Sequence, residues 1–313
     1  MKPTIVVPDD FPSVFSGSAA AAALRDAGTV RVFSERGAED ETELIRRIGD
    51  ANAVINIRAY AKFTPRVLDA CPNLRLISIW GTGTDNVDHA ACTARGVTVA
   101  NTPGVNAHSV AEHTVALMLS VTRAIPAMDA AMRAGGWPRR LLTQLEGKTL
   151  GLIGFGAIGS RVAALAKPFG MRVLVSTWGA DNGRAAAARA QHVPLDTLLR
   201  DSDIVSLHMR LTAETGGILG REQFAMMKPT AFLVNTARAG LVDRDAMIEA
   251  LQHDLLAGAA LDVFHHEPIA PGDPLLSLSN VVLTPHDGGM TAEVIALGLR
   301  RAVENVEKFL FSA

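Results

Sequence analysis

Three residues with chemically useful side chains, Arg238, Glu267 and His286, each follow a short apolar run. An arginine can hold a carboxylate and a neighbouring oxygen through its planar fork. A histidine can take up or return a proton near neutral pH, and an adjacent carboxylate orients the imidazole and raises its pKa. The set therefore suits the oxidation of a 2-hydroxy acid, in which a hydroxyl proton and a hydride leave neighbouring atoms.

A metal site is the competing interpretation of the histidines. His265 and His266 are adjacent in the sequence, so their side chains point apart, and no third ligand has suitable spacing. Taken singly, Arg238, Glu267 or His286 has an ordinary structural explanation. Their joint occurrence behind a glycine-rich loop favours the catalytic interpretation, and we expect no metal.

The glycine-rich loop carries Gly154, Gly156 and Gly159 in the pattern GxGxxG. It ends an apolar run and opens a helical stretch, which is the context that a dinucleotide-binding loop requires. The first glycine allows a tight turn, the second lets the backbone approach a pyrophosphate, and the third lets helix and strand pack closely. The amides of Ala157 and Ile158 are expected to face the phosphates at the helix N-terminus.

The choice between NAD and NADP depends on the end of the next apolar run. An NAD site usually has a carboxylate there, but Ser176, Thr177 and Trp178 occupy this position. Either the hydroxyls hold the ribose of NAD, or Arg184 meets the 2′-phosphate of NADP. Because Arg184 is more typical of a solvated helix residue, NAD is slightly favoured. We expect Trp178 at the rim of the adenine pocket.

The elements that position these residues follow a parallel α/β pattern, with short apolar runs alternating with helical stretches. We expect two doubly wound units: residues 1–100 plus 286–313, and residues 101–285. A helix near Ser109–Arg123 is predicted to begin with a capping box formed by Ser109 and Glu112. A final helix, Ala292–Leu310, is expected to return to the first unit. The predicted strands are Thr4–Val7, Val30–Phe33, Ala53–Ile57, Leu76–Ile79 and Thr98–Ala100, then Leu150–Gly154, Arg172–Ser176, Ile204–Leu207, Phe232–Asn235, Gly258–Asp262 and Val281–Thr284.

Length and composition agree with this division. The 313 residues exceed one ordinary core, and 48% of them are hydrophobic. A net charge of −2, with scattered basic residues, gives no sign of nucleic acid or an anionic membrane as partner. The two cysteines cannot build a disulfide framework, and no run reaches the length of a membrane helix. We expect a cytoplasmic protein.

The whole pattern resembles the D-isomer-specific 2-hydroxyacid dehydrogenase family. The resemblance covers nearly the whole chain, and the spacing of Arg238 and Glu267 is similar to that of the phosphoglycerate branch. It implies an NAD(P)-dependent dehydrogenase of D-2-hydroxy acids, with two Rossmann-like domains and the active site in the cleft between them. It also implies a homodimer, formed through the Ser109–Arg123 helix and the Trp137 loop. The motifs that carry the resemblance are Trp80–Asp88, Ser109–Glu112, Gly147–Leu150 and Thr284–His286.

Further site residues are implied by the resemblance alone. Those expected at the cofactor are Val110, His208, Thr236, Ala237, Asp262 and Gly288. Those expected at the substrate are Arg58, Ala59, Gly81, Thr82, Gly83 and Asn106.

Several positions depart from the family pattern. Tyr60 stands where the phosphoglycerate branch has a second arginine, which weakens support for a phosphate-bearing substrate. Arg210 replaces a frequent proline. Asp287 replaces an apolar residue after the catalytic histidine and is expected to point away from the cleft.

Two other functions remain open on these residues. Phosphite oxidation uses the same three groups, and a nucleotide-sensing, non-enzymatic binding protein can retain them. A formate dehydrogenase would carry glutamine in place of Glu267.

Overall fold

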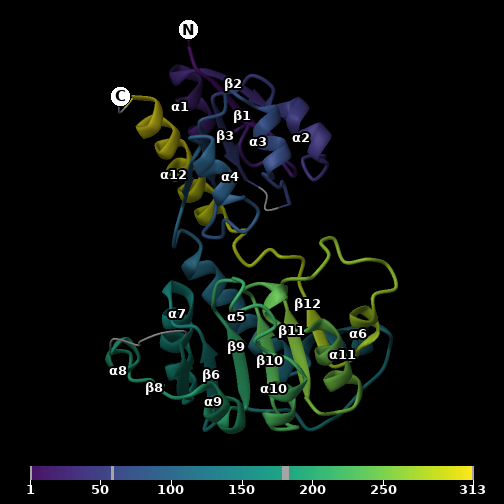
Figure 1. Ribbon diagram of the computed structural model, residues 1–313. Coiled ribbons are helices and arrows are strands. Elements are labelled where there is room, and N and C mark those ends of the chain that lie inside the picture. Colours follow the sequence, from purple (N-terminus) through teal and green to yellow (C-terminus); the bar gives the residue numbers. More distant parts are fainter. Residues whose placement is uncertain (1, 58–59, 178–182, 312–313) are drawn as a thin grey trace. The chain divides into compact units, whose positions relative to one another are not determined.

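The computed structural model describes residues 2–57, 60–177 and 183–311 (Figure 1). It divides into two compact units, the first formed by Met1–Asn106 and Met290–Ala313, the second by Ala107–Gly289. Each contains a parallel sheet with helices on both faces, which confirms the predicted fold class.

Among its described residues, unit 1 holds a five-stranded sheet in the order β2-β1-β3-β4-β5. Helices α1 and α12 pack on one face, while α2, α3 and α4 cover the other. Four of these helices begin at a residue whose side chain accepts a hydrogen bond from an amide of the first turn. The elements are β1 (Thr4–Val7), α1 (Ala19–Ala27), β2 (Thr29–Val32), α2 (Glu41–Ile48), β3 (Ala53–Asn56), α3 (Pro65–Ala70), β4 (Leu76–Ile79), α4 (His89–Ala94), β5 (Thr98–Asn101) and α12 (Ala292–Phe311).

Unit 2 holds a seven-stranded sheet in its described part, in the order β12-β11-β10-β9-β6-β7-β8. The chain leaves β6 toward β7 and later returns to β9 on the other side of β6, so the strand order reverses there. Ligands of open α/β sheets bind at such a point. The elements are α5 (Ala107–Thr122), α6 (Ile125–Arg133), β6 (Thr149–Ile153), α7 (Ala157–Ala166), β7 (Arg172–Ser176), α8 (Arg184–Ala187), β8 (Gln191–His192), α9 (Leu195–Asp201), β9 (Ile204–Leu207), α10 (Arg221–Met226), β10 (Phe232–Asn235), α11 (Arg244–Gln252), β11 (Gly258–Leu261) and β12 (Val281–Leu283), with 3-10 turns η1 (Lys167–Phe169), η2 (Ala239–Leu241) and η3 (Pro274–Ser277).

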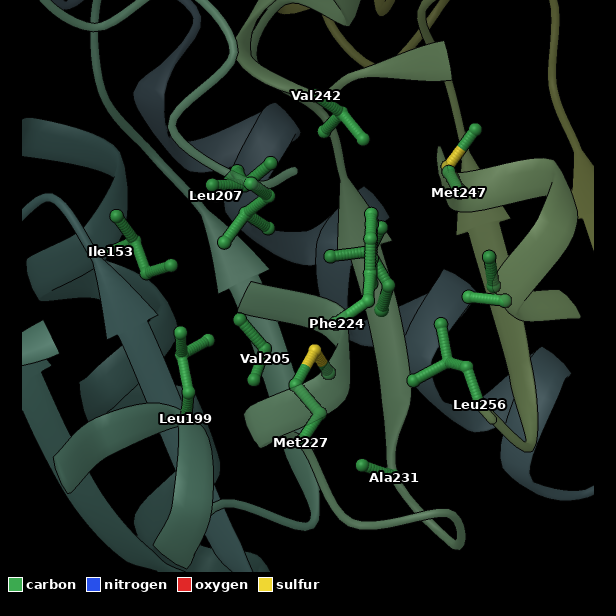
Figure 2. Close-up of a cluster of buried hydrophobic side chains, with 14 of the residues drawn as sticks. Ile153, Leu199, Val205, Leu207, Phe224, Met227, Ala231, Val242, Met247 and Leu256 are labelled. Atoms are coloured by element: carbon green, nitrogen blue, oxygen red, sulfur yellow. The ribbon is translucent and has the colours of Figure 1, made fainter. Parts of the chain in front are cut away.

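The core of unit 2 lies in two layers, because successive strand residues point to opposite faces of the sheet. On β9, Val205 and Leu207 pack against α9, α10 and α11, and Figure 2 shows this layer around Phe224. Ile204, the residue before Val205, belongs to the opposite layer beneath α5 and α7. Burial on both faces explains why these strands are continuous apolar runs.

The unit boundaries differ from the predicted ones by a few residues. At the first, Thr102 donates its backbone amide to Gly81 and accepts the amide of Gly81 on Oγ1, at 2.9 and 2.8 Å, which keeps this segment in unit 1. At the second, the amides of Asp287 and Gly288 both bond to Asp262, so residues 286–289 stay with unit 2.

The predicted capping box at Ser109 is wrong. Helix α5 begins earlier, at Ala107, and Ser109 lies inside it. The Ser109 hydroxyl instead donates to the carbonyl of Gly288 at 2.7 Å. The hydroxyl that local spacing predicted as a helix cap is thus used in a tertiary hydrogen bond to a residue 179 positions away.

No single helix of the described chain is long and apolar enough to cross a membrane. Helices α5 and α6 together reach that length and hydropathy, but the pair is bent by 60°.

Candidate active site

Arg238, Glu267 and His286 come from the carboxyl ends of β10, β11 and β12, which are neighbours in the sheet of unit 2 (Figure 1). Parallel strands end at one edge, so the loops that carry these side chains all leave that edge.

Glu267 and His286 form a direct pair. Glu267 Oε2 lies 2.8 Å from His286 Nδ1, and Glu267 Oε1 accepts the backbone amide of Phe264 at 3.0 Å. Burial raises the pKa of Glu267, but the hydrogen bond and charge of His286, the Phe264 amide and the charge of Arg238 lower it overall. The carboxylate therefore stays ionised at neutral pH and fixes a proton on Nδ1 of the imidazole.

The turn that carries Arg238 is held by Asn235, a buried residue at the end of β10. Asn235 accepts the amide of Ala237 on Oδ1 and donates from Nδ2 to the carbonyl of Arg238, both at 3.0 Å. The Arg238 side chain donates from Nη1 to the carbonyl of Ala237 at 2.8 Å. Sequence reasoning did not assign Asn235 a role, although an amide side chain ending a fully apolar run is a recognisable signal.

His286 has a left-handed backbone, with φ of +56°. A residue other than glycine pays about 1–2 kcal/mol for this conformation. Asp262, only 2% exposed, holds the turn on either side: its carboxylate accepts the Thr284 hydroxyl at 2.6 Å and the amides of Asp287 and Gly288 at 3.1 Å. Burial raises the pKa of Asp262, while hydrogen bonds from His113, Thr284 and Gly288 lower it overall.

The glycine loop has the geometry of a phosphate cradle. Gly154 has φ of +97°, and a Cβ there would lie 2.5 Å from the carbonyl oxygen of His208. A Cβ on Gly159 would lie 2.5 Å from the carbonyl oxygen of Gly154. At Gly156, in contrast, nothing lies within 4 Å of such a Cβ.

Gly156 is also the N-cap residue that precedes α7, and the N-terminus of this helix has no side-chain cap. The free amides of Ala157 and Ile158 and the helix dipole favour an anion in this open space. The residues present therefore fit the pyrophosphate of a dinucleotide.

His208 packs against this loop, and its Nε2 lies 2.9 Å from the hydroxyl of Ser206. Burial lowers the pKa of His208 to about 3, so the imidazole is neutral at physiological pH. A neutral ring beside the phosphate cradle can exchange hydrogen bonds without a permanent charge.

The other residues predicted at the cofactor occupy two places in unit 2. Val110 is buried on α5, where its carbonyl accepts the Thr114 hydroxyl at 2.7 Å, and Thr114 Oγ1 lies 2.9 Å from Thr236 Oγ1. This contact links α5 to the end of β10. Ser176 ends β7 beside the loop, and Thr177 Oγ1 lies 3.2 Å from His192 Nε2. Trp178 lies outside the described residues.

The residues predicted to contact substrate belong to unit 1. Gly81 has φ of +139° and is tied to Thr102, while the carbonyl of Thr82, the residue before Gly83, accepts Nδ2 of Asn101 at 2.7 Å. Asn106 ends the first segment of unit 1, and its buried Oδ1 has no hydrogen-bond partner in the described structure. Arg58 and Ala59 lie outside the described residues.

Comparison with known proteins decides the family. Residues 115–288 match the NAD binding domain of the D-isomer specific 2-hydroxyacid dehydrogenases. The chain belongs to the D-isomer specific 2-hydroxyacid dehydrogenase family. The predicted resemblance is thereby confirmed, as are its nicotinamide cofactor and its class of NAD(P)-dependent oxidoreductase.

Individual relatives differ in how fully they match. A glyoxylate reductase from Korarchaeum cryptofilum is 36% identical over 315 residues, which cover 99% of this chain and 93% of that protein. A D-3-phosphoglycerate dehydrogenase from Archaeoglobus fulgidus is 42% identical over 253 residues, covering 80% of this chain but 48% of the relative. The chain thus spans about half the length of that dehydrogenase.

A solved structure matches nearly from end to end. The NADPH-dependent glyoxylate/hydroxypyruvate reductase from Sinorhizobium meliloti, in complex with NADP and malonate, gives a TM-score of 0.87 at 27% identity. The match covers 100% of this chain and 95% of that one.

Proposed function

We propose that this protein reduces a small 2-keto acid to the D-2-hydroxy acid, or catalyses the reverse oxidation, with Glu267 and His286 as the acid/base pair. The observation that carries the proposal is the 2.8 Å contact between Glu267 Oε2 and His286 Nδ1 beside the turn of Arg238. An acid/base histidine needs a fixed tautomer and a carboxylate to stabilise its charged form, and this contact supplies both.

The chain's own groups account for the proton and the carboxylate. Since Nδ1 of His286 is engaged by Glu267, Nε2 is the nitrogen that gives a proton to the carbonyl oxygen during reduction. The guanidinium of Arg238 binds the substrate carboxylate and polarises the C2 carbonyl through its fork. A nicotinamide cofactor held at the glycine loop by the amides of Ala157 and Ile158 would supply the hydride that C2 needs.

We propose glyoxylate or hydroxypyruvate rather than a phosphorylated keto acid as substrate. The full-length similarity to a glyoxylate reductase supports this choice. Tyr60 supports it too, because this side chain, whose hydroxyl donates to the buried carboxylate of Asp9 at 2.8 Å, lacks the positive charge of the arginine that it replaces.

The test is a panel of 2-keto acids with NADH and with NADPH. We expect turnover of glyoxylate or hydroxypyruvate, and the panel also decides the cofactor. His286→Ala is expected to lose activity by roughly a hundredfold or more. Full activity in that variant would refute the mechanism. No turnover across the panel would favour phosphite oxidation, tested with phosphite and NAD, or a binding protein that takes up NADH without catalysis.

We also propose that the protein is a homodimer and that it is located in the cytoplasm. Support for the dimer comes from α6, none of whose residues is buried in the described chain, and from the exposed side chains of Trp137 and Leu141 that follow it. Exposed apolar surfaces of this kind are typical of protein interfaces.

A further inference from the structure

The turn from Thr284 to Gly288, which carries His286, is fastened at both ends. Before His286, the Thr284 hydroxyl donates to Asp262 Oδ1 at 2.6 Å. After it, the amides of Asp287 and Gly288 donate to the same carboxylate. The His286 side chain is thus presented from a strained backbone whose neighbours share one buried anchor.

His113, on the second turn of α5, completes this anchor from another element. Its Nε2 lies 3.0 Å from Thr284 Oγ1, 3.4 Å from Asp262 Oδ1 and 3.9 Å from Asp287 Oδ1. Its ring also forms a wall against Gly288, since a Cβ at that position would lie 3.0 Å from His113 Cδ2.

The direction of these hydrogen bonds follows from the single proton of a hydroxyl. Thr284 gives that proton to Asp262, so it must accept from His113, whose Nε2 therefore carries a proton. The hydrogen bond to Asp262 raises the pKa of His113, with burial opposing, which favours the same arrangement.

The candidate ligand atoms of His113, Asp262 and Asp287 lie within 4.8 Å of one another, as they would in a metal site. The hydrogen bonds described above argue against a metal there. A protonated Nε2 has no lone pair for a cation, and Asp262 already accepts bonds on both oxygens.

We propose that His113 is a positioning residue for the acid/base histidine: through Thr284, Asp262 and Gly288 it holds the turn that aims His286. The inference rests on the proposed function of His286. In the described part of the chain, the polar contacts of His113 go to Thr284, Asp262 and Asp287 rather than to His286, so His113 acts through the turn.

The experiment compares three variants. His113→Leu keeps similar volume without a donor, His113→Gln places an amide donor near the position of Nε2, and Thr284→Val removes the hydroxyl between His113 and Asp262. We expect kcat to fall at least tenfold in His113→Leu and in Thr284→Val, and to recover to within about threefold of the parent in His113→Gln. The double variant His113→Leu/Thr284→Val should be no slower than the slower single one, because both break the same chain of bonds.

A second readout does not depend on activity. In protein labelled with ¹⁵N-histidine, the ring signals of His286, identified by their loss in His286→Gln, should report a fixed Nδ1–H tautomer in the parent. In His113→Leu they should shift toward a mixture of tautomers. His253→Leu is the matched control, because His253 is exposed at the end of α11, next to the opposite edge of the sheet.

Several outcomes overturn the inference. These are a kcat of His113→Leu within threefold of the parent, unchanged His286 signals, or additive losses in the double variant. If His113→Leu does not fold, Thr284→Val and His113→Gln decide by the same criteria. A parent without keto-acid turnover would contradict the proposed function instead, and the tautomer signals would still test the positioning.

Discussion

At the scale of one residue, Glu267 combines two properties. Its carboxylate accepts hydrogen bonds from the amide of Phe264 and the ring of His286, and it carries a negative charge. Glu267→Gln keeps the size of the side chain but removes the charge that stabilises a protonated His286. We expect kcat for keto-acid reduction to fall roughly tenfold to a hundredfold, less than in His286→Ala. Steady-state kinetics of both variants provide the measurement.

Glu222→Gln is the matched control, since Glu222 is an exposed glutamate in the first turn of α10. A Glu267→Gln enzyme as fast as this control would show that His286 needs no carboxylate partner.

His208 makes the stability of the protein fall as the pH is lowered. Because burial lowers its pKa to about 3, while an unfolded histidine titrates near 6.5, the unfolded chain binds a proton between these values and the folded chain does not. Unfolding is therefore favoured by this group as the pH falls below about 6.5. We expect the free energy of unfolding of His208→Gln, whose amide can replace Nε2 against Ser206, to decline less between pH 6.5 and 4 than that of the parent.

Urea unfolding at a series of pH values measures this difference. Parallel curves for parent and variant across the window would show that the imidazole titrates equally in both states.

At the scale of elements, the glycines of the loop between β6 and α7 serve two different purposes: Gly154 is required for the fold of the turn, and Gly156 leaves space for the cofactor phosphates. Gly154→Ala meets both a positive φ and the carbonyl of His208, so we expect it to unfold the protein more easily, by roughly 2 kcal/mol or more. Gly156→Ala has an ordinary extended backbone and open space, so we expect near-parental stability. Its methyl group fills the phosphate cradle, however, and should weaken NAD(P)H binding by about tenfold, which corresponds to ~1.4 kcal/mol.

Thermal unfolding and cofactor titration by fluorescence separate the two effects. A Gly156→Ala variant that binds NAD(P)H like the parent would place the pyrophosphate elsewhere.

The elements themselves were predictable where burial on both faces dictates an apolar run. Phe232–Asn235 and Arg172–Ser176 match the structure residue for residue for that reason. Strand β8 was missed, because its two residues, Gln191 and His192, are exposed and carry no period.

The sequence allowed prediction of the ionisable residues of the candidate site, but not of the residues that hold their turns in place. Arg238, Glu267 and His286 stand out by chemical type, and strand ends bring them to one edge. Asn235 acts through local hydrogen bonds, and its position at the end of an apolar run is a signal that sequence reasoning missed. His113 acts through a hydrogen bond across 171 residues, which sequence spacing does not encode. Ser109 shows the opposite failure, since a local motif was present but its hydroxyl bonds to a distant carbonyl.

At the scale of the whole molecule, α6 and the segment after it form an exposed apolar surface. Trp137 is 74% exposed and Leu141 is completely exposed, as large apolar side chains rarely are in a monomer. We expect the protein to be a homodimer in light scattering after size exclusion, and Trp137→Ser/Leu141→Ser to run as a monomer at micromolar concentration. Leu255→Ser, which changes an exposed leucine in the loop after α11, should stay dimeric. A monomeric parent, or a dimer that survives the double change, would remove this surface from the interface.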